Sequence, residues 1–312
     1  MNRGRKRSMR ALIHDPEAPA GLRLDTAPDP VPGPGQVLVE VRATALNFGE
    51  VKYLAAQRQP GEVSGWDAAG VVVQAAADGS GPSVGSRVVT FGWSGGWGGL
   101  RVVDVDELAV VPESVDLGAA SGLPVAGVTA LRAVRRLGPV VGRRVLVTGA
   151  SGGVGRFAVQ LAARAGAWVV ASVGSEARGE GLIELGAGEI VVGLDKVTDP
   201  VFGVLDNVGG QQLAQAFALL EEGGSAQAIG KASGEATTID FEEARIRGFR
   251  TSIEPFFVGP KFGPDLAYLV DLLDKGQLDP QIGWRGDWSR ASEAAKALLA
   301  RKINGKAILD IT

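Results

Sequence analysis

One stretch of the sequence reads Arg144-Val145-Leu146-Val147-Thr148-Gly149-Ala150-Ser151-Gly152-Gly153-Val154-Gly155. Its first five residues have the composition of a strand, and apolar residues at helical spacing run from Val154 to Ala165. Glycine at 152 lets the backbone approach a pyrophosphate, and glycine at 155 lets the helix pack closely on the strand. The free N–H groups and the positive dipole end of the helix favour phosphate oxygens. The stretch therefore predicts a dinucleotide site, and the alternative is a turn without a ligand in a chain of 46 glycines.

The end of the second predicted strand distinguishes NAD from NADP. An acidic residue at that position would bind the ribose 2′-hydroxyl of NAD. The strand Trp168–Val173 ends without one, whereas Ser172, Ser175 and Arg178 can donate hydrogen bonds to a 2′-phosphate. Glu176 lies nearby, but it falls in the first turn of the next predicted helix. The sequence therefore predicts NADPH as the cofactor, and a plain surface charge is the alternative role for Arg178.

Strands and helices alternate along the central part of the chain. Further strands are predicted at 189–192, 201–205 and 225–229. Such alternation is typical of a parallel sheet with crossover helices on its faces. The fold class expected for this part is α/β, with a doubly wound parallel sheet of the Rossmann type.

The first third of the chain has the pattern of a compact, mostly β unit. Short strand-like runs are separated by turn residues, at 37–43, 69–73, 86–91, 100–103 and 108–112. Helical spacing then runs over 119–137, with glycine and proline interrupting its first half. After residue 255 the sequence predicts a helix at 265–274, a turn and a last strand at 306–311. These patterns predict two domains, and 312 residues are enough to form both.

Composition excludes several classes of protein. The net charge of −3 gives no general attraction to nucleic acid or acidic lipid. No stretch approaches the roughly 20 apolar residues of a membrane span, so neither kind of partner is expected. The basic run Arg3–Arg7 lies outside any periodic pattern and is expected to be a disordered tail, with a binding arm as the alternative. No apolar stretch follows this run, so it does not have the pattern of a signal peptide.

Metal ligands are scarce in this chain. It has no cysteine and a single histidine, His14, in the strand-like run Met9–His14. Zinc sites typically combine cysteine, histidine and carboxylate ligands, so no metal is expected. Ser-His-Asp catalysis is equally unsupported, because His14 is the one available imidazole and is expected to be exposed or at the edge of the core.

Six motifs, in the right order, resemble those of the medium-chain dehydrogenase/reductase superfamily and, within it, its zinc-free quinone oxidoreductase-like branch. They are Ala45-Leu46-Asn47-Phe48-Gly49-Glu50, Gly65-Trp66-Asp67-Ala68-Ala69-Gly70-Val71-Val72, Leu123-Pro124-Val125-Ala126-Gly127-Val128-Thr129-Ala130, Thr148 to Gly155, Leu205-Asp206-Asn207-Val208-Gly209-Gly210 and Gly305-Lys306-Ala307-Ile308-Leu309-Asp310. The resemblance implies a GroES-like, mostly β substrate domain over 9–118, completed by 256–312. It implies a Rossmann NADPH-binding domain over 119–255 and leaves 1–8 as a disordered tail. The active site would lie in the cleft between the two domains.

The glycine turn, the strand end and the resemblance together predict the residues that bind the cofactor. They are Thr129, Ala150, Gly152, Gly153, Val154, Gly155, Ser172, Ser175, Arg178, Asn207, Ile229, Gly230, Lys231 and Phe256. By similarity, Asn207, the backbone from Ile229 to Lys231 and the region around Phe256 would approach the ribose and the nicotinamide.

Members of this branch typically reduce a quinone or a C=C bond conjugated to a carbonyl, by hydride transfer from C4 of NADPH. Negative charge then develops on the carbonyl oxygen, which needs a hydrogen-bond donor or a cation aimed at it. Asn47, Lys52 and Tyr53 are the predicted catalytic residues, and Tyr53, Lys52 or water would deliver the proton. The alternatives are a surface pair for Lys52 and Tyr53 and a helix cap for Asn47.

Several positions depart from the pattern of relatives. Glu50 stands where an Asp is usual, and Lys52 stands where relatives tend to carry a tyrosine, one position before Tyr53. The loop from Phe91 to Gly99 suggests a roomy, aromatic-lined site, and the alternative is that its tryptophans, Trp93 and Trp97, are loop anchors. These departures fall in the expected substrate site, so they bear on the substrate rather than on the cofactor.

Two functions are compatible with these features. The first is a zinc-independent NADPH-dependent quinone or enoyl reductase, cytoplasmic and homodimeric, with a small quinone or enone as its partner. The second is a non-catalytic NADPH-binding protein of the same fold, with a structural or sensing role. Oxidation of NADPH by a panel of quinones and enones separates the two.

Overall fold

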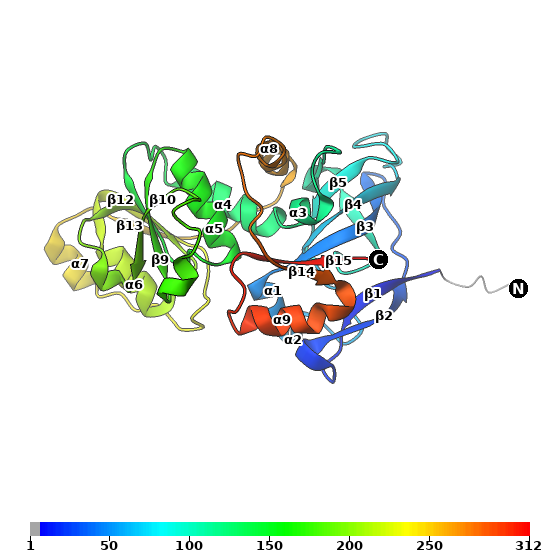
Figure 1. The fold of residues 1–312 in the computed structure, drawn as a ribbon, viewed down its shortest axis with the longest axis horizontal. Helices are drawn as coiled ribbons and strands as arrows, with labels where there is room; N and C mark the ends of the chain where they lie inside the picture. The colour runs from blue at the N-terminus through cyan, green and yellow to red at the C-terminus, as the bar shows by residue number, and fades with distance from the viewer. Residues whose placement is uncertain (1–6) are drawn as a thin grey trace, which may run out of the picture. The chain divides into compact units, whose positions relative to one another are not determined.

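The computed structural model describes residues 7–312, which form two compact units (Figure 1). We call them the split unit and the middle unit. The split unit comprises the chain up to Val128 together with Pro260–Thr312, and the middle unit spans Thr129–Gly259. We expected boundaries after residues 118 and 255, whereas the first observed boundary lies inside helix α4 (Pro124–Arg136). Residues 1–6 of the predicted tail lie outside the described residues. Ser8, the last residue of that predicted tail, instead begins strand β1 (Ser8–His14).

Six parallel strands form the sheet of the middle unit. From edge to edge they are β10 (Ala187–Val192), β9 (Trp168–Val173), β8 (Arg144–Val147), β11 (Val201–Asp206), β12 (Leu220–Ala228) and β13 (Ser252–Pro255). Numbered along the unit, the strands lie in the order 3-2-1-4-5-6, which is the order of Rossmann sheets that bind dinucleotides. The predicted doubly wound parallel sheet is therefore confirmed.

Strand β8 lies inside this sheet, and its sequence explains why. Val145, Leu146 and Val147 are wholly buried, with β9 and β11 paired on either side. A strand covered on both faces has a continuous apolar run of this kind. Helix α5 (Gly153–Arg164) packs on β8 and β9, and α6 (Gly210–Ala218) packs on β11 and β12. Each helix follows a glycine-containing turn, which brings its N-terminus to the carboxyl end of a strand.

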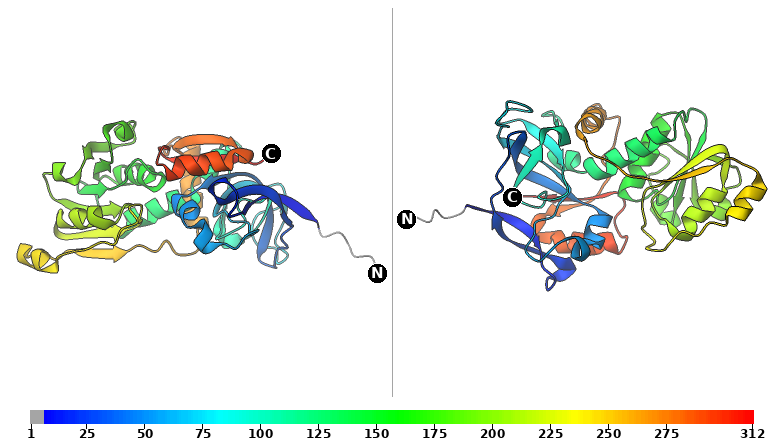
Figure 2. Two further views of the ribbon diagram at one scale, coloured as in Figure 1. Left: turned by 90° about the horizontal axis from the view of Figure 1, so that it is seen from below. Right: turned by 180° about the vertical axis from the view of Figure 1, so that it is seen from behind.

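Strand β13 and helix α7 (Phe241–Arg247) lie at one edge of the middle unit, as Figure 2 shows. Neither element was predicted from the sequence. Strand β13 has four residues, and its Ser252 and Glu254 side chains are exposed, so no apolar alternation indicates it. Its position comes from parallel backbone pairing with β12, which a local sequence pattern does not record.

The split unit contains a seven-stranded sheet and a two-stranded one. The larger sheet runs β14 (Ile282–Asp287), β15 (Lys306–Asp310), β3 (Gln36–Leu46), β4 (Asp67–Gln74), β5 (Arg87–Phe91) and β7 (Leu108–Val110), with β6 (Leu100–Asp104) paired to β3. Strand β2 (Leu22–Pro28) pairs with β1. The predicted mostly β, GroES-like domain is confirmed. Antiparallel pairing of β15 with β3 brings the C-terminal segment into the sheet of the N-terminal one.

Most predicted helices are present with small changes. The stretch predicted at 119–137 is two helices, α3 (Leu117–Ser121) and α4, which separate at Gly122 and Leu123. Pro124 begins α4, where its missing N–H costs no hydrogen bond. The helix predicted at 265–274 is α8 (Gly263–Asp274). Two short helices, α1 (Phe48–Lys52) and α2 (Leu54–Gln57), follow β3.

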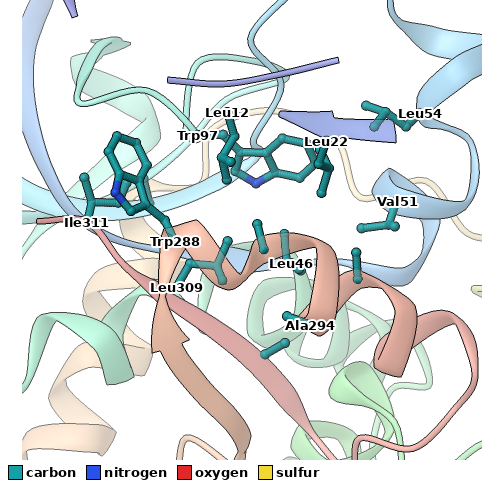
Figure 3. Close-up of a cluster of buried hydrophobic side chains, with 14 of the residues drawn as sticks. Leu12, Leu22, Leu46, Val51, Leu54, Trp97, Trp288, Ala294, Leu309 and Ile311 are labelled. Carbon is teal, nitrogen blue, oxygen red and sulfur yellow. The ribbon is translucent and has the colours of Figure 1, made fainter. Parts of the chain in front are cut away.

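One core cluster of the split unit contains two tryptophans, Trp97 and Trp288 (Figure 3). Both are almost wholly buried, so Trp97 is a loop anchor, which was one of its two considered roles. Helix α9 (Ala291–Leu299) contributes small side chains such as Ala294 to the cluster. Between residues 274 and 306 only a turn was predicted from the sequence, so neither β14 nor α9 was expected. The small side chains of α9 carry a weak apolar signal, and β14 owes its position to pairing with β15.

Gly155 permits a close approach of α5 to the turn before it. An added β-carbon would overlap the carbonyl oxygen of Gly149 and lie 2.7 Å from Cα of Ala150. Because both are backbone atoms, Gly155→Ala should lower the unfolding free energy by about 1–3 kcal/mol, measured by urea denaturation. The matched control is Gly174→Ala, whose added β-carbon meets no atom within 4 Å. A loss below about 0.5 kcal/mol in Gly155→Ala would contradict the close approach.

Candidate functional site

Except for Thr129 on α4, the cofactor residues predicted in the middle unit lie at or near the carboxyl edge of its sheet. They follow the ends of five of the six strands: Ala150 and Gly152 follow β8, Ser175 follows β9, Asn207 follows β11, Gly230 follows β12 and Phe256 follows β13. In a parallel sheet these ends share one edge, and ligands bind at this edge where the strand order reverses. The reversal lies at β8 and β11. The fold thus brings these residues together, and their contact with a cofactor stays a prediction.

The turn after β8 fits a pyrophosphate. Gly149 has a φ of 58°, in the left-handed region that favours glycine. Gly152 is the N-cap of α5, and a β-carbon there would lie only 3.4 Å from the Gly149 carbonyl oxygen. Half-buried Gly153 and Val154 form the first turn of this 12-residue helix. Residues 152–155 carry no side chain larger than valine, and the residues present fit the phosphates of a dinucleotide.

Three residues join the ends of β8 and β11. Thr148 Oγ1 donates to Asp206 Oδ1 at 2.5 Å and accepts from the Asn207 N–H at 3.0 Å. Asn207 Nδ2 donates to the Thr148 carbonyl oxygen at 2.9 Å, which fixes the orientation of its amide. The sequence analysis assigned Asn207 to the cofactor and gave no role to Thr148 or Asp206. A polar residue directly after β8 and another at the end of β11 were the available signal.

Asp206 holds the turn before α6. Its Oδ2 accepts from the Gly209 N–H at 2.7 Å, while its Oδ1 is bound to Thr148. Burial raises the pKa of Asp206 above its ordinary value, and the hydrogen bonds from Thr148 and Gly209 oppose that shift. Because both carboxylate oxygens have protein donors, the contacts of Asp206 support a structural role.

The end of β9 separates the three predicted phosphate donors. Ser172 is wholly buried, and its Oγ accepts from Gln212 Nε2 at 3.1 Å. Ser175 is exposed just after the strand, at the start of the short helix η3 (Glu176–Gly179). Arg178 lies in η3, and its Nε donates to Ser151 Oγ at 2.9 Å, which ties η3 to the glycine turn. The position of Ser175 and Arg178 suits a phosphate contact, whereas the Ser172 hydroxyl already has a protein partner; all three contacts stay predictions.

The remaining predicted cofactor residues lie on three segments. Gly230 needs its missing side chain, because a β-carbon would lie 2.5 Å from the Asn207 carbonyl oxygen. Ile229 is half-buried beside it, and Lys231 is exposed. Phe256 follows β13, donates its N–H to the Ala228 carbonyl oxygen and lies under the Arg136 guanidinium. Thr129 is buried on α4. Their contacts with a cofactor stay predictions.

A second polar group is buried in the split unit. Lys306 Nζ donates to Asn47 Oδ1 at 2.8 Å and to Asp67 Oδ2 at 3.2 Å. Asn47 Nδ2 donates to the same Asp67 oxygen at 3.0 Å, which closes a triangle of three side chains. Asp67 Oδ1 accepts from the Val125 N–H at 3.0 Å, at the first turn of α4. Asp67 and Lys306 stood in the motifs, but the sequence analysis gave neither of them a role.

Asn47 is also the N-cap of α1, so the capping role considered for it is confirmed. Its backbone N–H donates to Glu50 Oε2 at 3.4 Å, and Glu50 Oε1 accepts from the Trp66 N–H at 2.7 Å. Burial, and then the Asp67 charge, raise the pKa of Glu50 to about 8, while the N–H donors and Lys306 oppose the shift.

Arg101 lies buried near the same acids. It donates to the carbonyl oxygens of Gly65, Trp66, Thr90 and Gly92 and to the Thr90 hydroxyl. Burial lowers the pKa of Arg101 to about 10, and the charges of Asp67 and Glu50 oppose the shift. Arg101 therefore stays protonated at neutral pH and clamps the ends of two loops.

The other two predicted catalytic residues lie outside the buried group. Lys52 is exposed at the end of α1, and Tyr53 is exposed at the following position. This placement is compatible with either a proton donor or a surface pair, so their role stays a prediction. Trp93 is 55% exposed and packs edge-on against Phe91 and Trp66.

His14 is buried, and its Nδ1 lies 3.1 Å from the Gly21 carbonyl oxygen. Residues 7–312 contain no group of three or more His, Cys, Asp or Glu side chains that could hold a metal ion. Within the same residues, every helix is too short or too polar to cross a membrane.

Two family models match two parts of the chain. The alcohol dehydrogenase GroES-like domain matches residues 33–113, and the zinc-binding dehydrogenase domain matches residues 153–275. The chloroplastic quinone oxidoreductase QR1 of Triphysaria versicolor is 30% identical, over 97% of this chain and 98% of that protein. The chain therefore belongs to the medium-chain dehydrogenase/reductase superfamily, in its quinone oxidoreductase-like branch. It has the nicotinamide-dinucleotide-binding fold of that superfamily.

Other relatives differ in length. Acrylyl-CoA reductase AcuI of Ruegeria pomeroyi is 32% identical over 71% of this chain and 75% of that protein. Erythronolide synthase EryA2 of Saccharopolyspora erythraea is 33% identical over 80% of this chain, which spans only 7% of the synthase. Among solved structures, mycobacterial Rv1454c complexed with NADPH has a TM-score of 0.87 and 25% identity, over 97% of this chain and all of that one.

Glu50 should make the stability of the protein fall as the pH rises. Its pKa is about 8 in the folded chain, so the folded state keeps a proton that the unfolded state has already released. The stabilisation is complete below the ordinary value of 4.5 and is lost as the pH rises through about 8. Glu50→Gln is neutral at every pH, so its Tm should decline less than that of the wild type over this range. An equal decline in both proteins would assign the pH dependence to other groups.

Proposed function

We propose that the chain is a zinc-independent, NADPH-dependent oxidoreductase that reduces a quinone or the C=C bond of an α,β-unsaturated carbonyl. The glycine turn at the carboxyl end of β8, where the strand order reverses, is the observation that carries the proposal. Relatives named quinone oxidoreductase and acrylyl-CoA reductase support the reaction class. When bound, NADPH supplies a hydride to the electrophilic carbon of the substrate.

The choice of NADPH rests on the end of β9. Ser175 and Arg178 offer donors there, and Arg178 is already held against the glycine turn by Ser151. No acidic side chain follows β9 directly, and Glu176 is exposed in η3. An anionic 2′-phosphate is favoured by such donors and disfavoured by an acid. The NADPH complex of a structural neighbour supports the same assignment.

Independence from zinc rests on the ligands that the chain offers. One matching family model is named for zinc, but this chain has no cysteine, and its single histidine, His14, contacts the Gly21 carbonyl oxygen. The buried carboxylate of Asp67 is paired with the Lys306 ammonium at 3.2 Å. Charge on a developing oxyanion would then be stabilised by a side-chain donor, and Asn47 is the candidate.

Lys52 and Tyr53 supply the proton in this proposal. Both are exposed to water and lie five and six residues after Asn47 in the chain. Tyr53 Oη or Lys52 Nζ would give up a proton to the reduced substrate and recover it from solvent.

Oxidation of NADPH, followed by its absorbance, tests the proposal with a panel of benzoquinones, naphthoquinones and acyclic enones. We expect turnover with at least one acceptor, and unchanged turnover after dialysis against a zinc chelator. Tight NADPH binding without turnover across the panel would favour the non-catalytic alternative. Loss of activity in the chelator, restored by zinc, would contradict zinc independence.

The Arg178→Gln variant tests the cofactor preference. Removal of the guanidinium should weaken NADPH binding about tenfold, because one charge-assisted hydrogen bond to the 2′-phosphate is lost. NADH binding, measured by the same titration, should change less than about twofold. Arg164→Gln, on the last turn of α5, serves as the matched control. An equal loss for both cofactors would assign Arg178 to the structure of the turn.

A further inference from the structure

We propose that Asp67 and Lys306 are positioning residues that lock the Asn47 amide with its Nδ2 group as a donor to an anionic oxygen. The proposal deepens the proposed function and rests on it, since that oxygen would be the one on which charge develops during reduction. The ligand class is an enolate or phenolate type of oxyanion. Asn47 was predicted from its motif, whereas the roles of Asp67 and Lys306 follow from the contacts in the split unit.

The partners of Asn47 fix the direction of its amide. An asparagine amide has two orientations that exchange its oxygen and nitrogen, and its hydrogen-bond partners decide which orientation it takes. Lys306 Nζ has only protons to offer, so the atom 2.8 Å from it must be the Asn47 oxygen. Ionised Asp67 has only lone pairs to offer, so the atom 3.0 Å from its Oδ2 must be the Asn47 nitrogen. The two charges therefore permit a single orientation of the amide.

This orientation leaves one N–H group of Asn47 as a donor for a ligand. The Asn47 Nδ2 group has two protons, and one of them is donated to Asp67. Within residues 7–312 the structure gives the other proton no protein acceptor. The amide oxygen is held by the Lys306 ammonium. The group can therefore donate to an oxyanion, and it is not suited to act as a base.

The three residues differ in how much of their surface is exposed to solvent. Asn47 keeps 8% of its surface exposed, whereas Lys306 keeps 2% and Asp67 none. Asn47 is thus the most exposed of the three, so in this proposal it contacts the ligand, while Asp67 and Lys306 act through it. The Lys306 ammonium contacts the amide oxygen of Asn47, and its charge polarises the N–H bonds of the Nδ2 group.

Several elements of the fold hold the three side chains in place. The three side chains come from different elements, because Asn47 follows β3, Asp67 begins β4 and Lys306 begins β15. Asp67 also accepts from Val125 at the start of α4. Buried ion pairs add little to stability compared with apolar packing, but the contacts of this pair leave the Asn47 amide a single arrangement. Preorganised donors of this kind stabilise a developing charge without reorganisation.

The test measures binding of 4-nitrophenolate to the full chain saturated with NADP⁺, followed by the absorbance shift of the phenolate. Wild type should bind the anion, and Asn47→Ala should bind it about tenfold more weakly. Lys306→Met alone leaves Asp67 uncompensated and can fail to fold. The decisive variant is therefore the double substitution Asp67→Asn with Lys306→Met, which removes both charges together. Its Tm and its NADP⁺ affinity show whether it is folded.

The folded double variant should bind 4-nitrophenolate about tenfold more weakly, with NADP⁺ affinity within about twofold of wild type. With an accepted quinone or enone, kcat should fall about tenfold while KM changes less than about twofold. Lys302→Met, which removes an exposed lysine on the same segment, is the matched control and should change neither quantity.

Two results would overturn the inference. One is a folded double variant that binds 4-nitrophenolate as wild type does, and the other is a wild type that does not bind this anion. Failure of the proposed function looks different. In that case no acceptor oxidises NADPH, while the phenolate still binds in a manner that depends on Asn47 and on the Asp67–Lys306 pair.

Discussion

The parallel pairing of β8 with β11 is the contact on which the candidate nucleotide site depends. The chain leaves β8, forms β9 and β10 on one side, and returns to β11 on the other. This return places two turns side by side, the one before α5 and the one before α6. Thr148 and Asp206 then bond directly across the two strand ends. Without this pairing, the glycine turn would be an isolated loop, and Asn207 would have no fixed position near it.

Buried carboxylates are satisfied in two different ways in the two units. Asp206 accepts one hydrogen bond from the Thr148 hydroxyl and one from the Gly209 N–H, so it is held by neutral donors. Asp67 instead faces an ammonium, an amide and a backbone N–H. Neutral donors are enough to fix a turn, whereas a full positive charge also polarises the Asn47 amide between the two ions. The second arrangement is therefore the better candidate for chemistry.

Much of the fold could be predicted because the signals are local. The apolar run at β8, the glycine turn and the helix behind it follow one another in the sequence, so their geometry is encoded where they stand. Strands β13 and β14 and helix α9 were missed, because their places depend on pairing and packing with distant segments. In the site, Arg178 was predicted from the end of a strand, and Asn207 was predicted from the family resemblance. The partner of Ser172 was not, because Gln212 reaches it from another helix.

The sequence by itself determined the class of this protein: a dinucleotide-binding Rossmann sheet joined to a mostly β unit, with too few cysteines and histidines for an ordinary zinc site. Short-range periodicity and residue type are sufficient for such conclusions. Only the tertiary structure decided which polar groups act together. Lys306 and Asp67 are 239 residues apart in the chain, and the pairing of β15 with β3, and of β3 with β4, brings them to 3.2 Å. Hydrogen bonds depend on distance in space, and a linear pattern contains no such distance between remote segments.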